Sequence, residues 1–488
     1  MDEQQPEALP PEAPLAAPLA AEAAPIVETP PPVPVTPSPA PVEVPSVRDE
    51  ACRLLVRLDG PDARARELIE DCLRQIRFSP EDAALLSELV YGSLRARGRL
   101  DYYLSRVSHR PLEALSPWVR NLLRLSLYQV LDLDRIPVGA AIDAAVEVSK
   151  RHGHDGVVKF VNGCLRELAR QKAEDKLPPL PLDPVLRLAV ETSHPAWMAG
   201  RLAESYGFDR ASELLHASDQ APPLTLRVNA LRLRRDELAG RLHKAGLHVE
   251  ACRYSPWGVK VKDAADARKL PGFFEGDFHI QDESAQLLGL LMHAEPGWVV
   301  ADVCAAPGGK ASALAEWVGP HGRVFAFDRK SGSLEKLQST LRRQGVNHVL
   351  CESRDALAPR QDLLGRLDAV LVDAPCSALG VLRRRVEARW QTRPDQFAQQ
   401  AERQFKLLEA SSRYLRPGGI LVYATCTLDE EENEGVVRRF LDTHHDFAFE
   451  RAQFYVPHEA CSRDGFLQVW PGQEGMDGFF AARLRKLP

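Results

Sequence analysis

The sequence of 488 residues predicts a multidomain protein: an all-α bundle, then a small α/β domain, then a doubly wound α/β domain. Three observations support this fold class. Apolar residues recur at helical spacings of three and four over residues 47–172. In residues 173–285, short alternating segments surround one amphipathic helix. Near-continuous apolar strands alternate with helices over residues 286–488, which is typical of a parallel sheet covered on both faces.

Residues 1–46 consist almost entirely of Pro, Ala, Val and Glu, which predicts a disordered or polyproline-like tail without a catalytic role. This tail holds seven acidic residues and no basic one. The whole chain has a net charge of −6, but the remainder has 62 basic and 61 acidic residues. A surface that binds nucleic acid would therefore be a local patch.

Several protein classes are not favoured by the composition. No apolar stretch approaches the ~20 residues of a membrane-spanning helix, and the N-terminus lacks the features of a secretory signal. The nine cysteines are scattered without a C-x-x-C pair, which predicts neither a metal site nor a disulfide framework. We expect a cytoplasmic, monomeric protein that contacts no membrane and holds no metal.

The helical domain is predicted from five amphipathic segments that short turns separate, such as the one at Ser79-Pro80. The segments are DEACRLLVRL, EDAALLSELVYGSL, WVRNLLRLSLYQVLDL, AAIDAAVEVSKR and VVKFVNGCLRELAR. Arginine supplies 18 of the 20 basic residues between positions 48 and 170. Its planar guanidinium suits phosphate, which fits RNA contact, although a salt-bridged helical surface explains the same composition.

The small domain follows a Pro-rich connector at residues 176–184. TLRVN, HVEACRY and WGVKVKD are predicted strands, and RRDELAGRLHKAG is a predicted helix. A unit of this size fits a ferredoxin-like or RNA-recognition-motif-like layer. Because it lacks the aromatic motifs that stack bases, we do not expect its sheet to read bases directly.

The first strand of the third domain ends in a glycine-rich turn, CAAPGGK at residues 304–310. Ligands bind at the carboxyl ends of strands in open α/β sheets, and Gly308 and Gly309 allow close approach to the backbone. The turn matches neither a dinucleotide nor a phosphate-binding motif. It favours a carboxylate-bearing cofactor at the N-terminus of the following helix.

Three aspartates and two cysteines follow later strands of this domain. Asp328 lies about 20 residues past the glycine turn, where a carboxylate can accept ribose hydroxyls. Asp355 and Asp373 follow further strands; a lone aspartate in such a place is often a helix cap or turn former. Cys376 and Cys426 each come just after a buried strand, so both thiols are expected to face one pocket.

These motifs resemble the RsmB/NOP-type RNA (cytosine-C5)-methyltransferase family, and within it the bacterial 16S rRNA branch with an N-terminal NusB-like domain. The likeness rests on LVYGSLRARGRLDYYL, LRVN, IQDESAQL, DVCAAPGGK, AFDRK, DAPCSALGVLRR, RPGGILVYATCTLDEEENE and MDGFFAARL. It implies a NusB-like RNA-binding bundle, an RRM-like domain and a Rossmann-like class I methyltransferase domain.

The resemblance also implies a reaction and its residues. The cofactor would be S-adenosyl-L-methionine and the partner RNA, most specifically 16S rRNA. The cofactor-binding residues would be Cys304, Ala305, Ala306, Pro307, Gly308, Gly309, Lys310, Asp328, Asp355 and Asp373. Cys426 would be the nucleophile and Cys376 would assist product release, with Asp373 beside the target base. Spacing alone does not choose between the two thiols.

The chemistry explains why such a site needs a thiolate. Cytosine C5 is too electron-poor to attack a methyl sulfonium, but addition of a thiolate at C6 makes C5 enamine-like. A carboxyl such as that of Asp373 would stabilise charge as the ring is attacked. The base must also leave its stack to enter the pocket.

Three arginines are candidates for RNA contact: Arg227, Arg383 and Arg384. The loop that holds the last two departs from the family pattern. Ser-Ala-Leu-Gly stands where the family usually has Ser-Gly-Thr-Gly, and LRRRVEARW replaces the usual RRNPDIKW. This loop is expected to border the target base.

Two other functions remain open from the sequence. One is an RNA-binding assembly factor whose methyltransferase fold is catalytically silent, although the intact Cys376, Cys426 and Asp373 argue against it. The other is the same chemistry on tRNA, another RNA or DNA, against which the NusB-like domain favours rRNA by analogy.

Overall fold

Seven α-helices form the first domain of the computed structural model, which describes residues 46–61, 63–262 and 266–488. The expectation for the N-terminal tail concerns residues that, up to position 45, lie outside this range. The helices are α1 (Val47–Leu58), α2 (Ala65–Gln75), α3 (Pro80–Arg95), α4 (Arg97–Val107), α5 (Pro117–Asp132), α6 (Val138–His152) and α7 (Asp155–Ala173).

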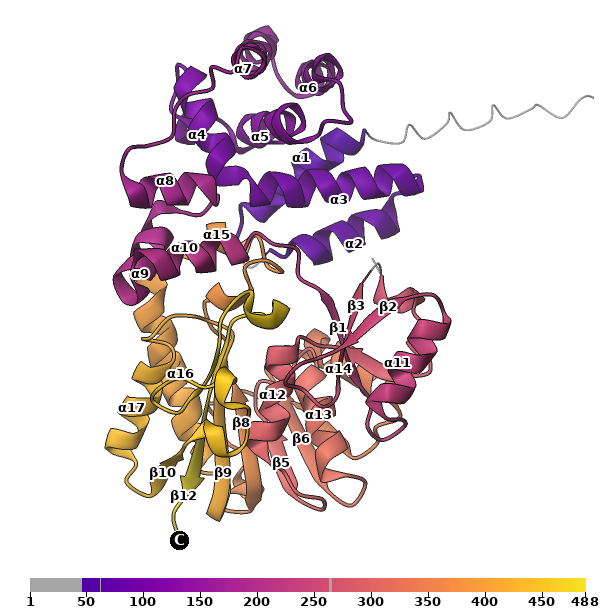
Figure 1. The fold of residues 1–488 in the computed structure, drawn as a ribbon, viewed down its shortest axis with the longest axis vertical. Coiled ribbons are helices and arrows are strands. Elements are labelled where there is room, and N and C mark those ends of the chain that lie inside the picture. The colour runs from indigo at the N-terminus through magenta and orange to yellow at the C-terminus, as the bar shows by residue number, and fades with distance from the viewer. Residues whose placement is uncertain (1–45, 62, 263–265) are drawn as a thin grey trace, which may run out of the picture. The chain divides into compact units, whose positions relative to one another are not determined.

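Helix α5 is the centre of this bundle and packs against α1, α3, α4, α6 and α7 (Figure 1). Both α3 and α5 begin with a Ser-Pro pair, in which Ser79 or Ser116 caps the helix and proline occupies its first position. Opposite sides of α5 face two cores, since Leu123 belongs to one apolar cluster and Leu125 to the other. The predicted all-α bundle is confirmed.

Three further helices, which the sequence analysis did not anticipate, follow the Pro-rich connector: α8 (Pro184–Glu191), α9 (Ala196–Tyr206) and α10 (Phe208–Ala217). They share an apolar cluster with Leu379, Leu382 and Leu428, which lie in the loops after the two predicted site cysteines. These helices therefore pack against the loops of the site.

The small domain is a four-stranded antiparallel sheet in the order β2-β3-β1-β4, and α11 packs on β2 and β3. Its elements are β1 (Leu224–Val228), α11 (Arg235–Lys244), β2 (His248–Ala251), β3 (Gly258–Lys262) and β4 (Phe278–Ile280). The three predicted strands and the predicted helix are confirmed. The fourth strand adds an edge beside β1.

The third domain contains an eight-stranded mixed sheet with the order β10-β12-β9-β8-β5-β6-β7, in which β11 pairs with β12. Strands β5 to β9 are parallel, whereas β10, β11 and β12 pair antiparallel. The strands are β5 (Val299–Asp302), β6 (Arg323–Asp328), β7 (Val349–Ser353), β8 (Leu367–Asp373), β9 (Leu415–Thr425), β10 (Phe447–Glu450), β11 (Leu467–Val469) and β12 (Phe479–Lys486). The predicted doubly wound sheet and closing hairpin are confirmed.

Helices cover both faces of this sheet, as its near-continuous apolar strands require. One face packs on α12 (Glu283–Met292), α13 (Gly309–Val318) and α14 (Ser331–Gln344). The other packs on α16 (Phe397–Ser412) and α17 (Glu434–Thr443), while the short α15 (Ala388–Gln391) precedes α16. Neighbouring residues of one strand, such as Val300 and Ala301 of β5, point into opposite cores.

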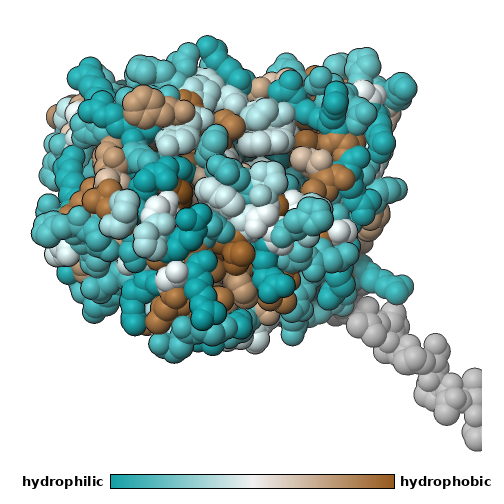
Figure 2. Space-filling view, turned by 90° about the horizontal axis from the view of Figure 1, so that it is seen from below, coloured by the Kyte–Doolittle hydropathy of each residue, from teal (hydrophilic) through white to brown (hydrophobic). Residues whose placement is uncertain are grey.

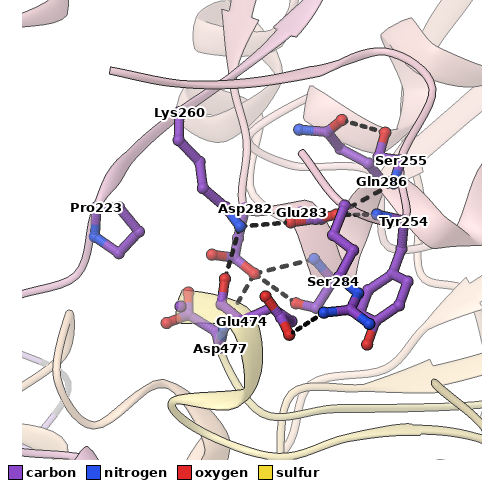
Figure 3. A network of polar contacts seen from close by, with 12 residues as sticks. Pro223, Tyr254, Ser255, Lys260, Asp282, Glu283, Ser284, Gln286, Glu474 and Asp477 are labelled. Atoms are coloured by element: carbon purple, nitrogen blue, oxygen red, sulfur yellow. Dashed lines mark hydrogen bonds and ion pairs between the residues drawn. The ribbon is translucent and has the colours of Figure 1, made fainter. Parts of the chain in front are cut away.

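A polar network with the buried Glu283 at its centre joins the small domain to the third domain (Figure 3). The Lys260 ammonium of β3 lies 2.9 Å from Glu283 at the start of α12 and donates to the carbonyl of Glu474, 2.6 Å away. Glu283 has no exposed surface, and its other carboxylate oxygen accepts the backbone N–H groups of Tyr254 and Ser255. Because each buried charge has partners, this joint holds the two domains together without an orphaned carboxylate.

Within the part of the chain that the structure describes, none of the helices combines the length and apolarity needed to span a bilayer. One face of the molecule is drawn in Figure 2, where hydrophilic residues predominate and hydrophobic ones form small separated patches.

Candidate active site

The predicted site residues gather where β5 and β8 lie side by side, the point at which the order of the parallel strands reverses. Strands β6 and β7 lie on one side of β5, and β8 and β9 on the other. Loops at the carboxyl ends of neighbouring strands diverge at such a switch point and leave room for a ligand.

The glycine turn connects β5 to α13 and is fastened to the end of β6. The Ala305 N–H donates to the carbonyl of Phe327 at 2.9 Å, and the Ala306 N–H donates to Asp328 at 3.2 Å. Gly308, the N-cap of α13, has a φ of 112°, a conformation that residues with a Cβ rarely adopt. The turn thus presents backbone at the N-terminus of α13, as the sequence analysis expected.

The three strand-end aspartates occupy different surroundings. Asp328 accepts the N–H groups of Ala306 and Lys330, so it lies directly against the glycine turn. Asp355 is exposed, and its carboxylate accepts the N–H of Leu357, as in an Asx turn. Asp328 therefore contacts the glycine turn, whereas the Asp355 carboxylate bonds to a backbone N–H two residues along its own loop.

Asp373, at the end of β8, forms an ion pair of 2.5 Å with Lys310 of the glycine turn. Burial lowers the pKa of the Lys310 ammonium, but the charge and hydrogen bond of Asp373 outweigh burial and leave this pKa above its usual value. The Lys310 ammonium also lies 5.4 Å from the centre of the Phe479 ring. A cation is therefore fixed at the floor of the site.

Asp302, at the end of β5, is a site residue that the sequence analysis did not single out. Its side chain is buried, and one of its carboxylate oxygens has no hydrogen-bond partner among the described residues. Burial raises the pKa of Asp302 to about 7, and the nearby Asp373 carboxylate adds to the rise. Its position directly before the glycine turn is the same strand-end signal that identified Asp328.

The two predicted site cysteines lie in contact: the Sγ atoms of Cys376 and Cys426 are 3.4 Å apart. A hydrogen bond from Cys376 lowers the pKa of the Cys426 thiol against the effects of burial and Asp373, with help from the positive charges of Lys310 and Arg385. The same bond, together with burial, raises the pKa of the Cys376 thiol. Cys426 is therefore the thiol with the greater thiolate character.

Backbone contacts hold the two cysteine loops against each other. The Gly380 N–H donates to the carbonyl of Cys426 at 2.9 Å, and the hydroxyls of Ser377 and Thr427 lie 2.6 Å apart. A side chain at Gly380 would place its Cβ 2.4 Å from the carbonyl oxygen of Gly478, so only glycine fits this crossing. The contact between the sulfurs follows from this close packing of backbone.

Two buried side chains, the Gln404 amide and the Glu432 carboxylate, hold the Cys376 loop through hydrogen bonds to its backbone. Gln404 of α16 donates to the carbonyl of Pro375 at 2.9 Å and to Glu432 at 2.7 Å. Glu432 in turn accepts the N–H of Ser377 at 3.0 Å. Neither Gln404 nor Glu432 was predicted, because a polar residue within an amphipathic helix or loop carries no local signal of such a role.

The structure corrects two of the three candidate RNA contacts. Arg227 has no exposed surface, and its guanidinium is bound to α13 inside the protein. Arg383 is buried and donates to Asp477 at 2.5 Å. Arg384 is one-third exposed, but it too is paired with Asp282 and Asp477. Buried carboxylates, rather than phosphates, neutralise these arginines.

The departures from the family pattern fall in the same loop. Ala378, where the family usually has glycine, adopts a φ of 62°, which glycine tolerates better than alanine. Arg385 makes only a long ion pair with Glu387 at 3.9 Å, and its Nε has no hydrogen-bond partner among the described residues. Of the three consecutive arginines, Arg385 is the least neutralised by the protein.

A parallel sheet with this strand order and an antiparallel strand beside β9 is the Rossmann-like fold of methyltransferases, and in this protein two thiols lie in contact near its glycine turn. The sequence comparisons agree with this class. Residues 290–485 match the family model described as 16S rRNA methyltransferase RsmB/F. Residues 45–170 match the NusB family, and residues 194–268 match the ferredoxin-like domain of RsmF/B-like methyltransferases.

The chain belongs to the RsmB/F family of 16S rRNA methyltransferases, as the sequence motifs predicted. It is 37% identical over 448 residues to a probable ribosomal RNA small subunit methyltransferase B of Bacillus subtilis, covering 90% of this chain and 99% of that protein. A ribosomal RNA small subunit methyltransferase B of Klebsiella pneumoniae is 34% identical over 417 residues, covering 84% and 92%.

Solved structures support the same fold. The crystal structure of a protein designated PH0851 superposes with a TM-score of 0.76 at 25% identity, covering 90% of this chain and 99% of that chain. A methyltransferase homologue from Pyrococcus horikoshii superposes with a TM-score of 0.54 at 29% identity, covering 63% and 98%.

Proposed function

We propose that the protein transfers a methyl group from S-adenosyl-L-methionine to C5 of a cytosine in 16S rRNA, with a transient covalent bond between Cys426 and C6 of the base. The observation that carries the proposal is the 3.4 Å contact between Cys376 and Cys426 beside the Lys310–Asp373 pair. Two thiols of opposite pKa shift suit a reaction in which one sulfur adds to the base and the other assists its release.

The residues around the glycine turn fit the proposed cofactor. The left-handed Gly308 exposes backbone at the N-terminus of α13, which favours a carboxylate. Asp328 lies at the end of β6 to accept ribose hydroxyls, and the unpartnered oxygen of Asp302 offers a further acceptor. S-adenosyl-L-methionine, when bound, supplies an electrophilic methyl group on its sulfonium.

The protein's own groups account for the remaining chemistry. The hydrogen bond from Cys376 and the charge of Lys310 favour the thiolate of Cys426, which adds to C6 of cytosine. The Lys310 ammonium, held in place by Asp373, stabilises the negative charge that develops on the ring as the thiolate adds. Once C5 carries the methyl group, water takes up the C5 proton, the electron pair of the C5–H bond re-forms the C5–C6 double bond, and the bond between Cys426 and C6 breaks to return the Cys426 thiolate; Cys376 assists this expulsion.

The decisive experiment compares two single-cysteine variants. In Cys426→Ala, methyl transfer from labelled S-adenosyl-L-methionine to 16S rRNA should fall more than about 10³-fold, the scale on which loss of a nucleophile acts. Calorimetry should show that this variant still binds the cofactor. Retention of full activity in Cys426→Ala would contradict the assignment.

Cys376→Ala should behave differently, because it retains the nucleophile but lacks the group that assists release. We expect this variant to accumulate covalently on the RNA, which would appear as a slow band on a denaturing gel. Bisulfite mapping of rRNA from cells with and without the gene would then identify the methylated cytosine.

A further inference from the structure

Arg227 belongs to the small domain, yet most of its guanidinium's partners lie on α13 of the methyltransferase domain. Its side chain has no exposed surface. It donates to the carbonyl of Gly309 at 2.7 Å, to the hydroxyl of Ser312 at 2.9 Å and to the carboxylate of Glu316 at 2.6 Å. A fourth bond goes to Gln281, which follows β4.

These three partners form one acceptor row on α13. Positions 309, 312 and 316 are spaced by three and four residues, so they share one face of the helix. Two members of this row also bond to each other, since the Ser312 hydroxyl donates to the Gly309 carbonyl at 3.1 Å. Arg227 therefore bonds to the first two turns of α13, from the carbonyl of Gly309 to the carboxylate of Glu316.

A second residue of the small domain leaves no room for a side chain at Gly309. His279 of β4 pairs with Arg227 across the sheet, and a Cβ at Gly309 would lie 2.8 Å from its Nε2. Burial and the neighbouring arginines 227 and 343 lower the pKa of His279 to about 3, so the ring is neutral at ordinary pH. The histidine thus packs on the glycine turn without adding a charge to it.

Asn229, two residues further along the same segment, fastens the next helix. Its amide donates to the carbonyl of Gln344 at the end of α14 and to the carbonyl of Gly276, both at 2.9 Å. Helix α14 follows Asp328, just as α13 follows the glycine turn. One segment of the small domain therefore bonds to both helices that carry the cofactor-binding loops.

We infer that Arg227 is a positioning residue for the cofactor site: it fixes the Gly309 carbonyl, and through it the glycine turn and Lys310, from a separate domain. This inference rests on the proposed function. The Glu316 carboxylate supplies the charge that keeps the guanidinium buried, while the bond to Gly309 transmits its position.

The test separates cofactor affinity from stability. Arg227→Lys keeps a positive charge near Glu316 but lacks the planar fork that reaches both Glu316 and Gly309. Arg227→Met removes both. In each variant the Kd for S-adenosyl-L-methionine, measured by calorimetry on the full chain, should rise about tenfold or more, as expected for a lost hydrogen bond to a charged group. At saturating cofactor, kcat should stay within about threefold, because the cysteine pair is untouched.

Two matched variants act as controls. Glu316→Gln removes the buried countercharge but keeps an acceptor for Arg227, so it should lower the melting temperature while the Kd stays within about twofold. Arg343→Met deletes another arginine that joins α14 to the small domain, through the carbonyls of Phe273 and Phe278, and whose hydrogen bonds among the described residues do not include the glycine turn. It should likewise lower stability and leave the Kd unchanged.

The outcomes are distinguishable. A wild-type chain that binds no S-adenosyl-L-methionine would overturn the proposed function and this inference with it. Wild-type affinity in folded Arg227→Lys and Arg227→Met would overturn the inference alone. An equal loss of affinity in Arg343→Met would also overturn it, because any loosening of the domain joint would then have the same effect.

Discussion

At the residue scale, two identical thiols acquire different properties from their neighbours. Cys376 lies near the carboxylate of Glu432, which opposes its ionisation. The hydrogen bond from Cys376, with the charges of Lys310 and Arg385, lowers the pKa of Cys426 against the effects of burial and of the Asp373 carboxylate. The sequence motifs around the two cysteines suggest no such difference, because these charges come from other loops.

A pH profile of alkylation tests this difference. Because the pKa of Cys426 is lowered, its reaction with iodoacetamide should reach half its maximal rate at a lower pH than the ~8.5 typical of a free cysteine. The rate should rise with pH, since the thiolate is the reactive form. Peptide mass spectrometry over a pH series would follow Cys426 separately from the other cysteines.

Two variants test whether the contact with Cys376 sets the pH at which Cys426 reacts at half its maximal rate. In Cys376→Ala the hydrogen-bond donor is lost, so the half-maximal pH for Cys426 should move upward. Arg416→Ala, which removes an exposed charge paired with Asp368, should leave it in place. An unchanged profile in Cys376→Ala would show that the contact between the sulfurs does not control the Cys426 thiolate.

At the scale of elements, helices α8 to α10 hold the segment that follows Cys426. Arg201 of α9 donates to Asp429 at 2.6 Å and pairs with Glu431 at 2.8 Å, and its guanidinium lies 4.2 Å from the centre of the Phe397 ring. Asp429 is buried. These helices were not predicted as separate elements, although each shows a helical pattern. Their position against this loop could not be predicted, because nothing local in the sequence indicates which loop a helix will cover.

Arg201→Ala should therefore destabilise the protein by about 2–4 kcal/mol, since it leaves the Asp429 carboxylate buried without its charged partner. Urea unfolding would measure the change in the free energy of unfolding. Arg187→Ala on α8 is a suitable control: its pair with Glu191 is exposed, and its loss should cost less than about 0.5 kcal/mol. Equal effects of the two changes would mean that the Arg201 pair does not brace this loop.

At the scale of the whole molecule, the helical and methyltransferase domains share side chains. Trp390 of α15 donates to the carbonyl of Leu94 at 2.9 Å, and its ring lies 5.0 Å from the guanidinium of Arg97. Val386 has no exposed surface and belongs to an apolar cluster of the helical domain. The loop after Cys376 thus continues into the core of the NusB-like bundle.

Trp390→Ala should separate these two domains energetically. Loss of its packing and hydrogen bond should cost about 3–5 kcal/mol and divide one calorimetric unfolding transition into two. Leu122→Ala, a cavity inside the helical domain, should lower the transition temperature without dividing it. A single transition in Trp390→Ala would show that the domains remain coupled by other contacts.

Much of the fold and of the candidate site could be predicted because both depend on local periodicity and on strand ends. Apolar alternation identified the strands of the small domain, and near-continuous apolar runs identified those of the third domain. Side chains after neighbouring parallel strands meet at one edge, which is why Cys376 and Cys426 were expected together. The prediction for Arg227 was wrong because an arginine has the same sequence signal whether it faces phosphate or a buried carboxylate.

By itself, therefore, the sequence determined the order of the domains, the glycine turn and the residues at the strand ends, since these follow from neighbours along the chain. Only the tertiary structure decided the partners of the charged groups: Arg227 with Glu316, Arg383 with Asp477, and Lys310 with Asp373. Such pairs join residues far apart in the sequence, and burial decides their energies because a charge removed from water must meet its counterpart in space.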